Sequence, residues 1–253
     1  MKIAAIVQAR MSSTRLPGKV LLSLGKRTVI DQVFHQLSFS STIGTTVLAT
    51  TSDTSDDILA EWGANHQKNV FRGNLDDVLK RYYDAARQFN ADVVVRVTGD
   101  CPLIDPDVTD LVVERFLKGD LDYASNVQPP TFPDGLDTEV FSIAALELAN
   151  REATLHSERE HVTPFIKKNA RRFRIGNVKS AEDYSRYRWT IDTKEDLDFV
   201  RQVLARLQPP LGYVRMHDVI DLLSANPTLA RINAHIRRDE GYAISLKHDK
   251  ENT

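Results

Sequence analysis

The segment 8–19 carries an unusual density of groups that bind phosphate. It contains three cationic side chains, Arg10, Arg15 and Lys19, together with three hydroxyl side chains and a glycine. Arginine forks and a lysine ammonium bind phosphate oxygens, and hydroxyl and backbone donors can complete such a site. These groups predict a loop that holds a triphosphate, although their composition fits a solvated surface loop equally well. The segment matches neither the G-x-x-x-x-G-K-[ST] pattern of ATPases nor the G-x-G-x-x-G pattern of dehydrogenases.

Two aspartates follow stretches that are predicted to be strands. Asp100 comes after the apolar run 93–97, and Asp192 comes after the stretch 189–191. If both strands are parallel and central, the two carboxylates converge at the carboxyl edge of the sheet, where open α/β sheets bind ligands. Magnesium is usually bound through one or two carboxylates plus substrate phosphates. The pair is therefore the predicted metal site, with a turn former at Asp100 and a helix cap at Asp192 as the alternatives.

Two further arginines could serve either a ligand or the fold. Arg72 follows a short predicted strand, and it either contacts a phosphate or base or donates to a surface ion pair. Arg96 alternates with apolar residues in a strand that should be buried, where an unpaired cation is costly. A ligand phosphate or a buried carboxylate must therefore neutralise Arg96, and we favour the carboxylate.

The predicted nucleotide site comprises Gln8, Ala9, Arg10, Ser13, Arg15, Lys19, Arg72 and Asp100. Lys19, Asp100 and Asp192 are the predicted catalytic residues.

A second group of polar residues could bind an acceptor. Ser157-x-x-Glu160 fits a capping box, which places Arg159 and His161 in the first turn of a helix. His161 is either a catalytic base or a structural histidine. The acidic residues around the Pro- and Gly-rich loop 128–135 could bind sugar hydroxyls or form turns. The predicted substrate-binding residues are Asp134, Asp137, Glu139, Arg159 and His161.

Short apolar runs alternate with amphipathic segments along the chain, and these elements must position the candidate residues. The runs 3–7, 46–49 and 93–97 precede segments with helical spacing at 29–37, 58–64 and 108–117. This alternation is typical of an α/β fold with a doubly wound, mainly parallel sheet. Thr193-x-x-Asp196 fits a second capping box, so Asp192 should directly precede a helix.

The Pro-rich stretch 128–135 interrupts regular structure and marks a change along the chain. We predict one domain over residues 1–210, in which 1–125 form a nucleotide half and 126–210 an acceptor half. A helical appendage is predicted to follow over 211–253.

The composition argues against several classes of partner. Lys and Arg total 33 against 35 Asp and Glu, a formal net charge of -2, so no global positive field exists to hold long nucleic acid. No apolar stretch approaches the ~20 residues that span a bilayer, and no signal-peptide pattern opens the sequence. Cys101 is the only cysteine, and we expect it to be a packed residue rather than a nucleophile. We expect a cytoplasmic protein without nucleic-acid or membrane partners.

Several motifs resemble those of one superfamily. The run Ala9-Arg10-x4-Arg15-Leu16-Pro17-Gly18-Lys19 is similar to the opening signature of the CMP-KDO and acylneuraminate cytidylyltransferases. The rest of the chain resembles more closely the SpsF group of that superfamily, which is named for spore-coat polysaccharide biosynthesis. The matching pieces run in order through segments 71–79, 97–105, 132–137, 157–164, 188–193 and 233–246.

The resemblance implies a nucleotide-diphospho-sugar transferase fold of the GT-A-like type, with a small acceptor and dimerisation subdomain. It implies an enzyme that transfers CMP from CTP to an acidic sugar, releasing pyrophosphate, for surface polysaccharide biosynthesis. The same metal pair is implied, because Asp100 matches the family's G-D-x-P-L aspartate and Asp192 its D-T-x-E-D aspartate. Attack of one anion on another calls for a divalent ion, so Mg²⁺ is the expected cofactor.

The resemblance also implies a homodimer in which segment 126–169 approaches the partner. Four apolar residues of this segment, Phe132, Leu136, Val140 and Phe141, are more than a solvent-facing excursion should expose. A partner surface is one place for them, and the chain's own sheet is the other.

Two other functions stay open on the sequence alone. A glycosyltransferase of the GT-A fold would hold a nucleotide sugar, but the Asp-x-Asp element is absent around Asp100. A non-catalytic nucleotide-binding scaffold is the third reading, and the presence of both carboxylates argues against it. A sugar-1-phosphate nucleotidyltransferase lacks support, because the G-x-G-T-R opening is missing.

Overall fold

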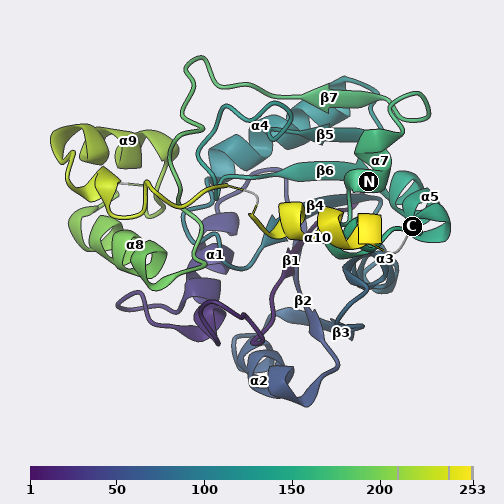
Figure 1. Ribbon diagram of the computed structural model, residues 1–253, viewed down its shortest axis with the longest axis horizontal. Helices are drawn as coiled ribbons and strands as arrows, with labels where there is room; N and C mark the ends of the chain where they lie inside the picture. The colour runs from purple at the N-terminus through teal and green to yellow at the C-terminus, as the bar shows by residue number, and fades with distance from the viewer. Residues whose placement is uncertain (210, 239, 252–253) are drawn as a thin grey trace.

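A seven-stranded sheet forms the centre of the computed structural model, which describes residues 1–209, 211–238 and 240–251 (Figure 1). The strand order is β3-β2-β1-β4-β6-β5-β7. β1, β2, β3 and β4 pair in parallel, β5 and β7 are parallel, and β6 is antiparallel to both neighbours. The strands are β1 (Ile3–Gln8), β2 (Thr45–Thr51), β3 (Asn69–Gly73), β4 (Val93–Thr98), β5 (Tyr123–Ser125), β6 (Glu139–Ser142) and β7 (Ile175–Asn177). The predicted α/β fold with a mainly parallel sheet is confirmed.

Helices cover both faces of this sheet. In β1, Ile3, Ala5 and Val7 pack in one apolar cluster with α1, α2 and α4, while Ala4 and Ile6 pack in a second with α3 and α5. Because both faces are covered, the central strands appear in the sequence as continuous apolar runs. The helices are α1 (Val29–Leu37), α2 (Asp57–Asn65), α3 (Val78–Gln88), α4 (Pro106–Lys118), α5 (Ile143–Glu152), α6 (His156–His161), α7 (Pro164–Lys168), α8 (Lys194–Arg206), α9 (Met216–Ala225) and α10 (Glu240–Glu251).

The two loops with the strongest chemical signals start side by side at one edge of the sheet. Gln8 at the end of β1 is paired with Thr98 at the end of β4, and the Gly99 N–H donates to the Gln8 carbonyl at 2.8 Å. A Cβ at Gly99 would lie 2.8 Å from the Ala9 Cβ. Glycine is therefore needed for the two loops to approach so closely.

The prediction of a strand around 189–191 is wrong. This stretch belongs to none of the seven strands, and its neighbour Arg188 forms only an isolated bridge with Asp134. It is extended and buried instead, with the Trp189 and Ile191 side chains packed in a third apolar cluster with α8 and α9. The Ile191 N–H donates to the Asp100 carbonyl at 2.8 Å. A contact between loops, rather than a sheet ladder, thus brings the two predicted metal-binding aspartates together.

The four apolar residues assigned to a partner surface are buried within their own chain. Leu136, Val140 and Phe141 have no exposed surface, and Phe132 is 4% exposed. Val140 and Phe141 lie in β6, and the other two pack in the third cluster. Of the two places left open by the sequence, the chain's own sheet and helices cover these side chains, so they give no support for a partner surface.

One of the two predicted capping boxes is confirmed. Thr193 caps α8 and accepts from the Asp196 N–H. Ser157 does not cap α6, which begins at His156 after Leu155. The Ser157 N–H donates instead to the Asp249 carboxylate of α10 at 3.0 Å. The predicted cap was misplaced because a distant helix supplies the partner of this N–H group.

The division into a nucleotide half, an acceptor half and an appendage stays a prediction. Its boundary residue Pro210 and the last two residues of the chain lie outside the described residues.

No helix of the described residues is long and apolar enough to cross a membrane.

Candidate active site

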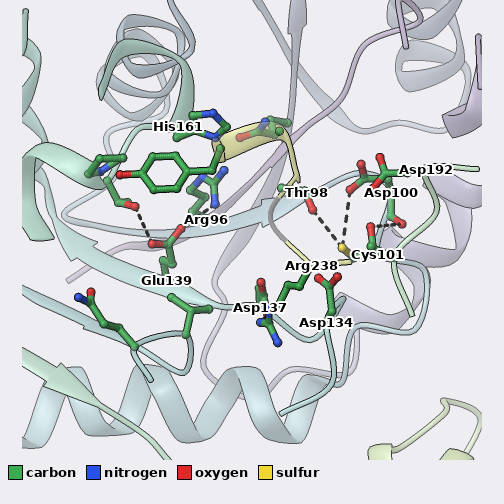
Figure 2. Close-up of a pocket in the computed structure, with 18 of the residues that line it drawn as sticks. Arg96, Thr98, Asp100, Cys101, Asp134, Asp137, Glu139, His161, Asp192 and Arg238 are labelled. Carbon is green, nitrogen blue, oxygen red and sulfur yellow. Dashed lines mark hydrogen bonds and ion pairs between the residues drawn. The ribbon is translucent and has the colours of Figure 1, made fainter. Parts of the chain in front are cut away.

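Two adjoining cavities open at the carboxyl ends of β1 and β4, with volumes of about 690 and 650 Å³. Each is within the usual size range for small-molecule sites. They share a boundary lined by Gln8, Arg15, Thr98, Asp100, His161, Asp192 and Gly241. After the roles that the sequence predicts for their lining residues, we call the cavity that contains Lys19 and Arg10 the nucleotide pocket and the other the acceptor pocket. Figure 2 shows Asp100 and Asp192 at one end of the acceptor pocket, with Arg96, Glu139 and His161 toward the other.

Lys19 lies between the two predicted metal ligands. Its Nζ is 2.5 Å from Asp100 Oδ2, 2.8 Å from Asp192 Oδ1 and 2.8 Å from the Ile191 carbonyl. Burial acts to lower the pKa of Lys19, but the two carboxylates outweigh it and raise that pKa. From the sequence, Lys19 is predicted to bind the triphosphate and the two aspartates to bind a metal. In the structure, the Lys19 ammonium contacts both carboxylates directly.

Arg188 organises Asp192 from the other side and was not among the predicted site residues. Its guanidinium reaches Asp192 at 2.6 Å, Asp134 at 2.9 Å and Asp196 at 3.0 Å. Burial acts to raise the pKa of Asp192, but Lys19, Arg15 and Arg188 hold it at about 2. Asp192 is therefore a fixed negative charge at neutral pH. The available signal in the sequence was an arginine directly before the apolar stretch 189–191, four residues before a candidate ligand.

The carboxylate pair fits a divalent cation. One ammonium nitrogen, that of Lys19, reaches both Asp100 and Asp192, so a single cation in its place could also be reached by both, provided that the Lys19 side chain moves aside. Carboxylate oxygens are the ligands magnesium prefers, and substrate phosphates usually complete its shell. The described residues hold no group of three or more His, Cys, Asp or Glu arranged as a metal site.

Most of the predicted nucleotide-binding residues line the nucleotide pocket. Gln8, Ala9, Arg10, Ser13, Arg15, Lys19 and Asp100 all do so. Arg72 does not, because it lies within β3 and its guanidinium reaches Asp57 at 2.7 Å and the Thr51 carbonyl at 2.8 Å. Its position favours the ion-pair reading.

Arg81 of α3 also lines the nucleotide pocket, although it is not among the residues predicted from the sequence. It is 2% exposed, and it donates to the Asn74 carbonyl at 2.6 Å. Its Nε is buried without a hydrogen-bond partner among the described residues, as is Oε1 of Gln8. Burial lowers the pKa of Arg81. From the sequence alone, an arginine in a helical segment cannot be assigned either to a ligand contact or to a structural contact.

Four of the predicted substrate-binding residues line the acceptor pocket, namely Asp134, Asp137, Glu139 and His161. Arg159 does not. Its guanidinium donates to Asp77 at 3.0 Å and to the Asn150 carbonyl at 2.7 Å, so it links α6 to the start of α3 and to α5. His161 faces the C-terminal helix, with Nε2 2.9 Å from the Ser245 hydroxyl.

Glu139 is the buried carboxylate that neutralises Arg96. Its Oε2 accepts from Arg96 at 2.6 Å, and its Oε1 accepts from the Tyr123 and Thr163 hydroxyls, each at 2.6 Å. Lys167 lies 3.3 Å from Oε1. Both carboxylate oxygens are thus engaged within the protein, which argues against Glu139 as a direct ligand for sugar hydroxyls. The preference for a buried carboxylate opposite Arg96 is confirmed.

Glu139→Gln is expected to lower the free energy of unfolding at pH 7 by about 3 kcal/mol, because it leaves buried cations without their counter-charge. Burial acts to raise the pKa of Glu139, but Lys167 and Arg96 depress it from 4.5 to about 2. Its stabilising contribution is therefore complete above pH 4.5 and is lost as the pH falls toward 2. Urea unfolding at pH 7, 4 and 3 should show the gap between variant and wild type closing. Glu114→Gln, at an exposed pair with Lys118, is the control, and a gap that does not depend on pH would contradict the assignment.

Cys101 is buried beside the site, with its Sγ 3.0 Å from the Thr98 hydroxyl. Burial, followed by the Asp100 charge, raises the pKa of this thiol well above its ordinary value. A thiol held neutral is a poor nucleophile, in agreement with a packed residue.

The mainly parallel seven-stranded sheet, covered by helices on both faces, is the nucleotide-diphospho-sugar transferase fold, which nucleotidyltransferases share. The model of the cytidylyltransferase family matches residues 4–218, and the chain belongs to that family. It is similar to the spore coat polysaccharide biosynthesis protein SpsF of Bacillus subtilis, with 32% identity over 235 residues that cover 90% of this chain and 96% of that protein. It is also similar to a 3-deoxy-manno-octulosonate cytidylyltransferase of Trichlorobacter lovleyi, with 33% identity over 117 residues, 46% of each chain.

Among solved structures, a cytidylyltransferase from Leptospira borgpetersenii superposes with a TM-score of 0.88 and 36% identity, covering 94% of this chain and all of that one. The resemblance noted in the sequence is confirmed. The protein is a CTP-dependent nucleotidyltransferase.

Proposed function

We propose that this cytidylyltransferase transfers CMP from CTP to an acidic sugar and releases pyrophosphate. The CMP-sugar would then serve the synthesis of a surface polysaccharide, such as that of a spore coat. One observation carries the proposal. The two cavities share Asp100 and Asp192 on their common boundary. A nucleotide in one and an acceptor in the other would meet at the carboxylate pair, as a direct transfer requires.

The charges of the acceptor pocket support an anionic acceptor. Basic side chains outnumber acidic ones on its lining, and although most of them form ion pairs within the protein, a guanidinium has several N–H donors and can also bind a carboxylate on the sugar. The basic residues are Arg15, Arg96, Lys167, Lys168, Arg188, Arg237 and Arg238, and the acidic ones are Asp100, Asp134, Asp137, Glu139 and Asp192. The names of two relatives, one a polysaccharide biosynthesis protein and one acting on 3-deoxy-manno-octulosonate, point the same way.

The reaction we propose is a single in-line displacement. The acceptor hydroxyl oxygen forms a bond to the α-phosphorus of CTP while the bond from that phosphorus to pyrophosphate breaks, and the hydroxyl proton passes to a base assisted by an aspartate. Arg10, Arg15 and Lys19 carry the positive charge that binds the triphosphate. A magnesium ion bound by Asp100 and Asp192 would neutralise the charge of the pyrophosphate. Positioning and neutralisation supply the acceleration, and no covalent enzyme intermediate is needed.

A screen of CTP, UTP, ATP and GTP against acidic sugars, with and without Mg²⁺, tests the proposal. Release of pyrophosphate should require CTP, magnesium and an acidic sugar, and mass spectrometry should find CMP on the sugar. Transfer to neutral sugars or to sugar phosphates in preference to acids would contradict it. The homodimer and the cytoplasmic location stay predictions, and light scattering at micromolar concentration tests the first.

A further inference from the structure

The chain returns to the cleft after α9, beyond residue 218 where the family model ends. Figure 1 shows α9 at one side of the molecule and α10 in front of the central strands. Between them, Asn233 is 2% exposed and donates to the Arg188 carbonyl at 3.0 Å and to Asp196 at 2.8 Å. The returning chain is therefore anchored to the network that positions Asp192.

The segment formed by residues 233–238 and 240–249, which we call the C-terminal strap, is fastened on both sides of the cleft. On the acceptor side, Arg238 pairs with Asp137 and donates to the Phe132 carbonyl at 3.2 Å. On the opposite side, α10 packs on α6. There the Ser245 hydroxyl is hydrogen-bonded to Glu160 and His161, and Asp249 accepts from the Ser157 N–H. Because the strap is held by contacts on both sides, it crosses the mouth of the cleft.

Successive turns of the strap face different pockets. Tyr242 lines the acceptor pocket only, and its ring stands edge-on to His161, with centroids 5.1 Å apart. Ser245 and His248 line the nucleotide pocket only. Gly241 lines both, and a Cβ added there would meet no heavy atom within 4 Å. A larger side chain can therefore be accommodated at this position without displacing any neighbouring atom.

We propose that the C-terminal strap is part of the substrate-binding site, in which Gly241 forms a wall shared by both pockets and Tyr242 forms the acceptor-side wall. This inference rests on the proposed function through the assignment of CTP to the nucleotide pocket. The strap lies outside the region matched by the family model, so the family core alone does not complete the two pockets. Differences among strap residues can then give different substrate selectivity to proteins of the cytidylyltransferase family that share the same core.

Calorimetric titration with CTP and Mg²⁺ tests the proposal without any acceptor. Gly241→Leu is expected to raise the Kd for CTP by about tenfold or more, since it adds a bulky side chain at a residue that lines the nucleotide pocket. Leucine favours a helix more than glycine does, so a weakened helix would not explain the loss. Tyr242→Ala should leave the Kd for CTP within about twofold, because Tyr242 faces the other pocket. Lys247→Ala, an exposed change on α10 outside both pockets, is the matched control.

Lys19→Ala serves as the reference that separates failure of the strap from failure of the nucleotide pocket. If Lys19→Ala weakens CTP binding while Gly241→Leu leaves it unchanged, the strap is not part of the site and the inference is overturned. If neither variant affects CTP, the nucleotide pocket has been assigned wrongly and both proposals fall. Equal losses for Gly241→Leu and Lys247→Ala would also overturn the inference, because they would report a general disturbance of α10.

Discussion

Asp100→Asn is expected to lower the rate of CTP turnover by about a hundredfold or more while the protein stays folded. The substitution keeps the volume of the side chain but removes one of the two negative charges that face Lys19 at 2.5 and 2.8 Å. Neutralisation of transition-state charge by a bound metal contributes several kcal/mol, and each 1.36 kcal/mol is a factor of ten in rate. Steady-state assays of pyrophosphate release at saturating CTP measure the loss.

The control for this prediction is Asp198→Asn, which removes an exposed carboxylate of α8 that lies 3.9 Å from Arg201. It should keep the rate of the wild type. Circular dichroism and thermal melting establish that both variants fold. A well-folded Asp100→Asn protein that releases pyrophosphate at a near-normal rate would remove Asp100 from the proposed metal site.

Lys19→Ala is expected to weaken the binding of CTP by roughly ten- to a hundredfold and to affect CMP much less. We assign Lys19 to the outer phosphates, which only CTP carries, and a hydrogen bond to a charged group contributes about 1.5–3 kcal/mol. The structure adds a second expectation. Without the ammonium, Asp100 and Asp192 repel each other, so the depressed pKa of Asp192 should rise.

Calorimetric titration of both nucleotides, in the presence of Mg²⁺, measures the first effect. Lys26→Ala, an exposed change outside both substrate pockets, is the control. Equal losses of affinity for CTP and CMP would place Lys19 away from the outer phosphates and would leave it as a counter-ion of the two aspartates.

The elements that carry the site followed from local patterns. Predicted segments 3–7, 29–37 and 93–97 correspond to β1, α1 and β4 within one residue at each end, because apolar periodicity reports which faces of an element are buried. Both loops that leave β1 and β4 were expected at the carboxyl edge, and both are there. Asp192 was expected directly before a helix, and Thr193 does cap α8. The strand before Asp192 was wrong, since an extended, buried segment has the same apolar pattern as a strand whether or not it joins the sheet.

Which side chains meet was decided by the tertiary structure. Lys19 and Asp192 are far apart in the sequence but in contact in the fold, and Arg188 joins Asp134, Asp192 and Asp196 in one network. Local propensity and spacing contain no information on such pairs, because they depend on how separate elements pack.

The sequence by itself determined which residue types are available for chemistry and where: it predicts a cationic phosphate loop after the first strand and two aspartates for a metal, and it carries motifs that resemble those of the cytidylyltransferase family. The tertiary structure decided how those groups are used. It buried the apolar residues 132, 136, 140 and 141 that suggested a partner surface, and it engaged Arg72 and Arg159 in ion pairs outside the cleft. It also brought the C-terminal strap across both pockets. The physical reason is that a charged side chain can be satisfied equally well by a ligand or by a distant residue, and only the packing of the whole chain selects between them.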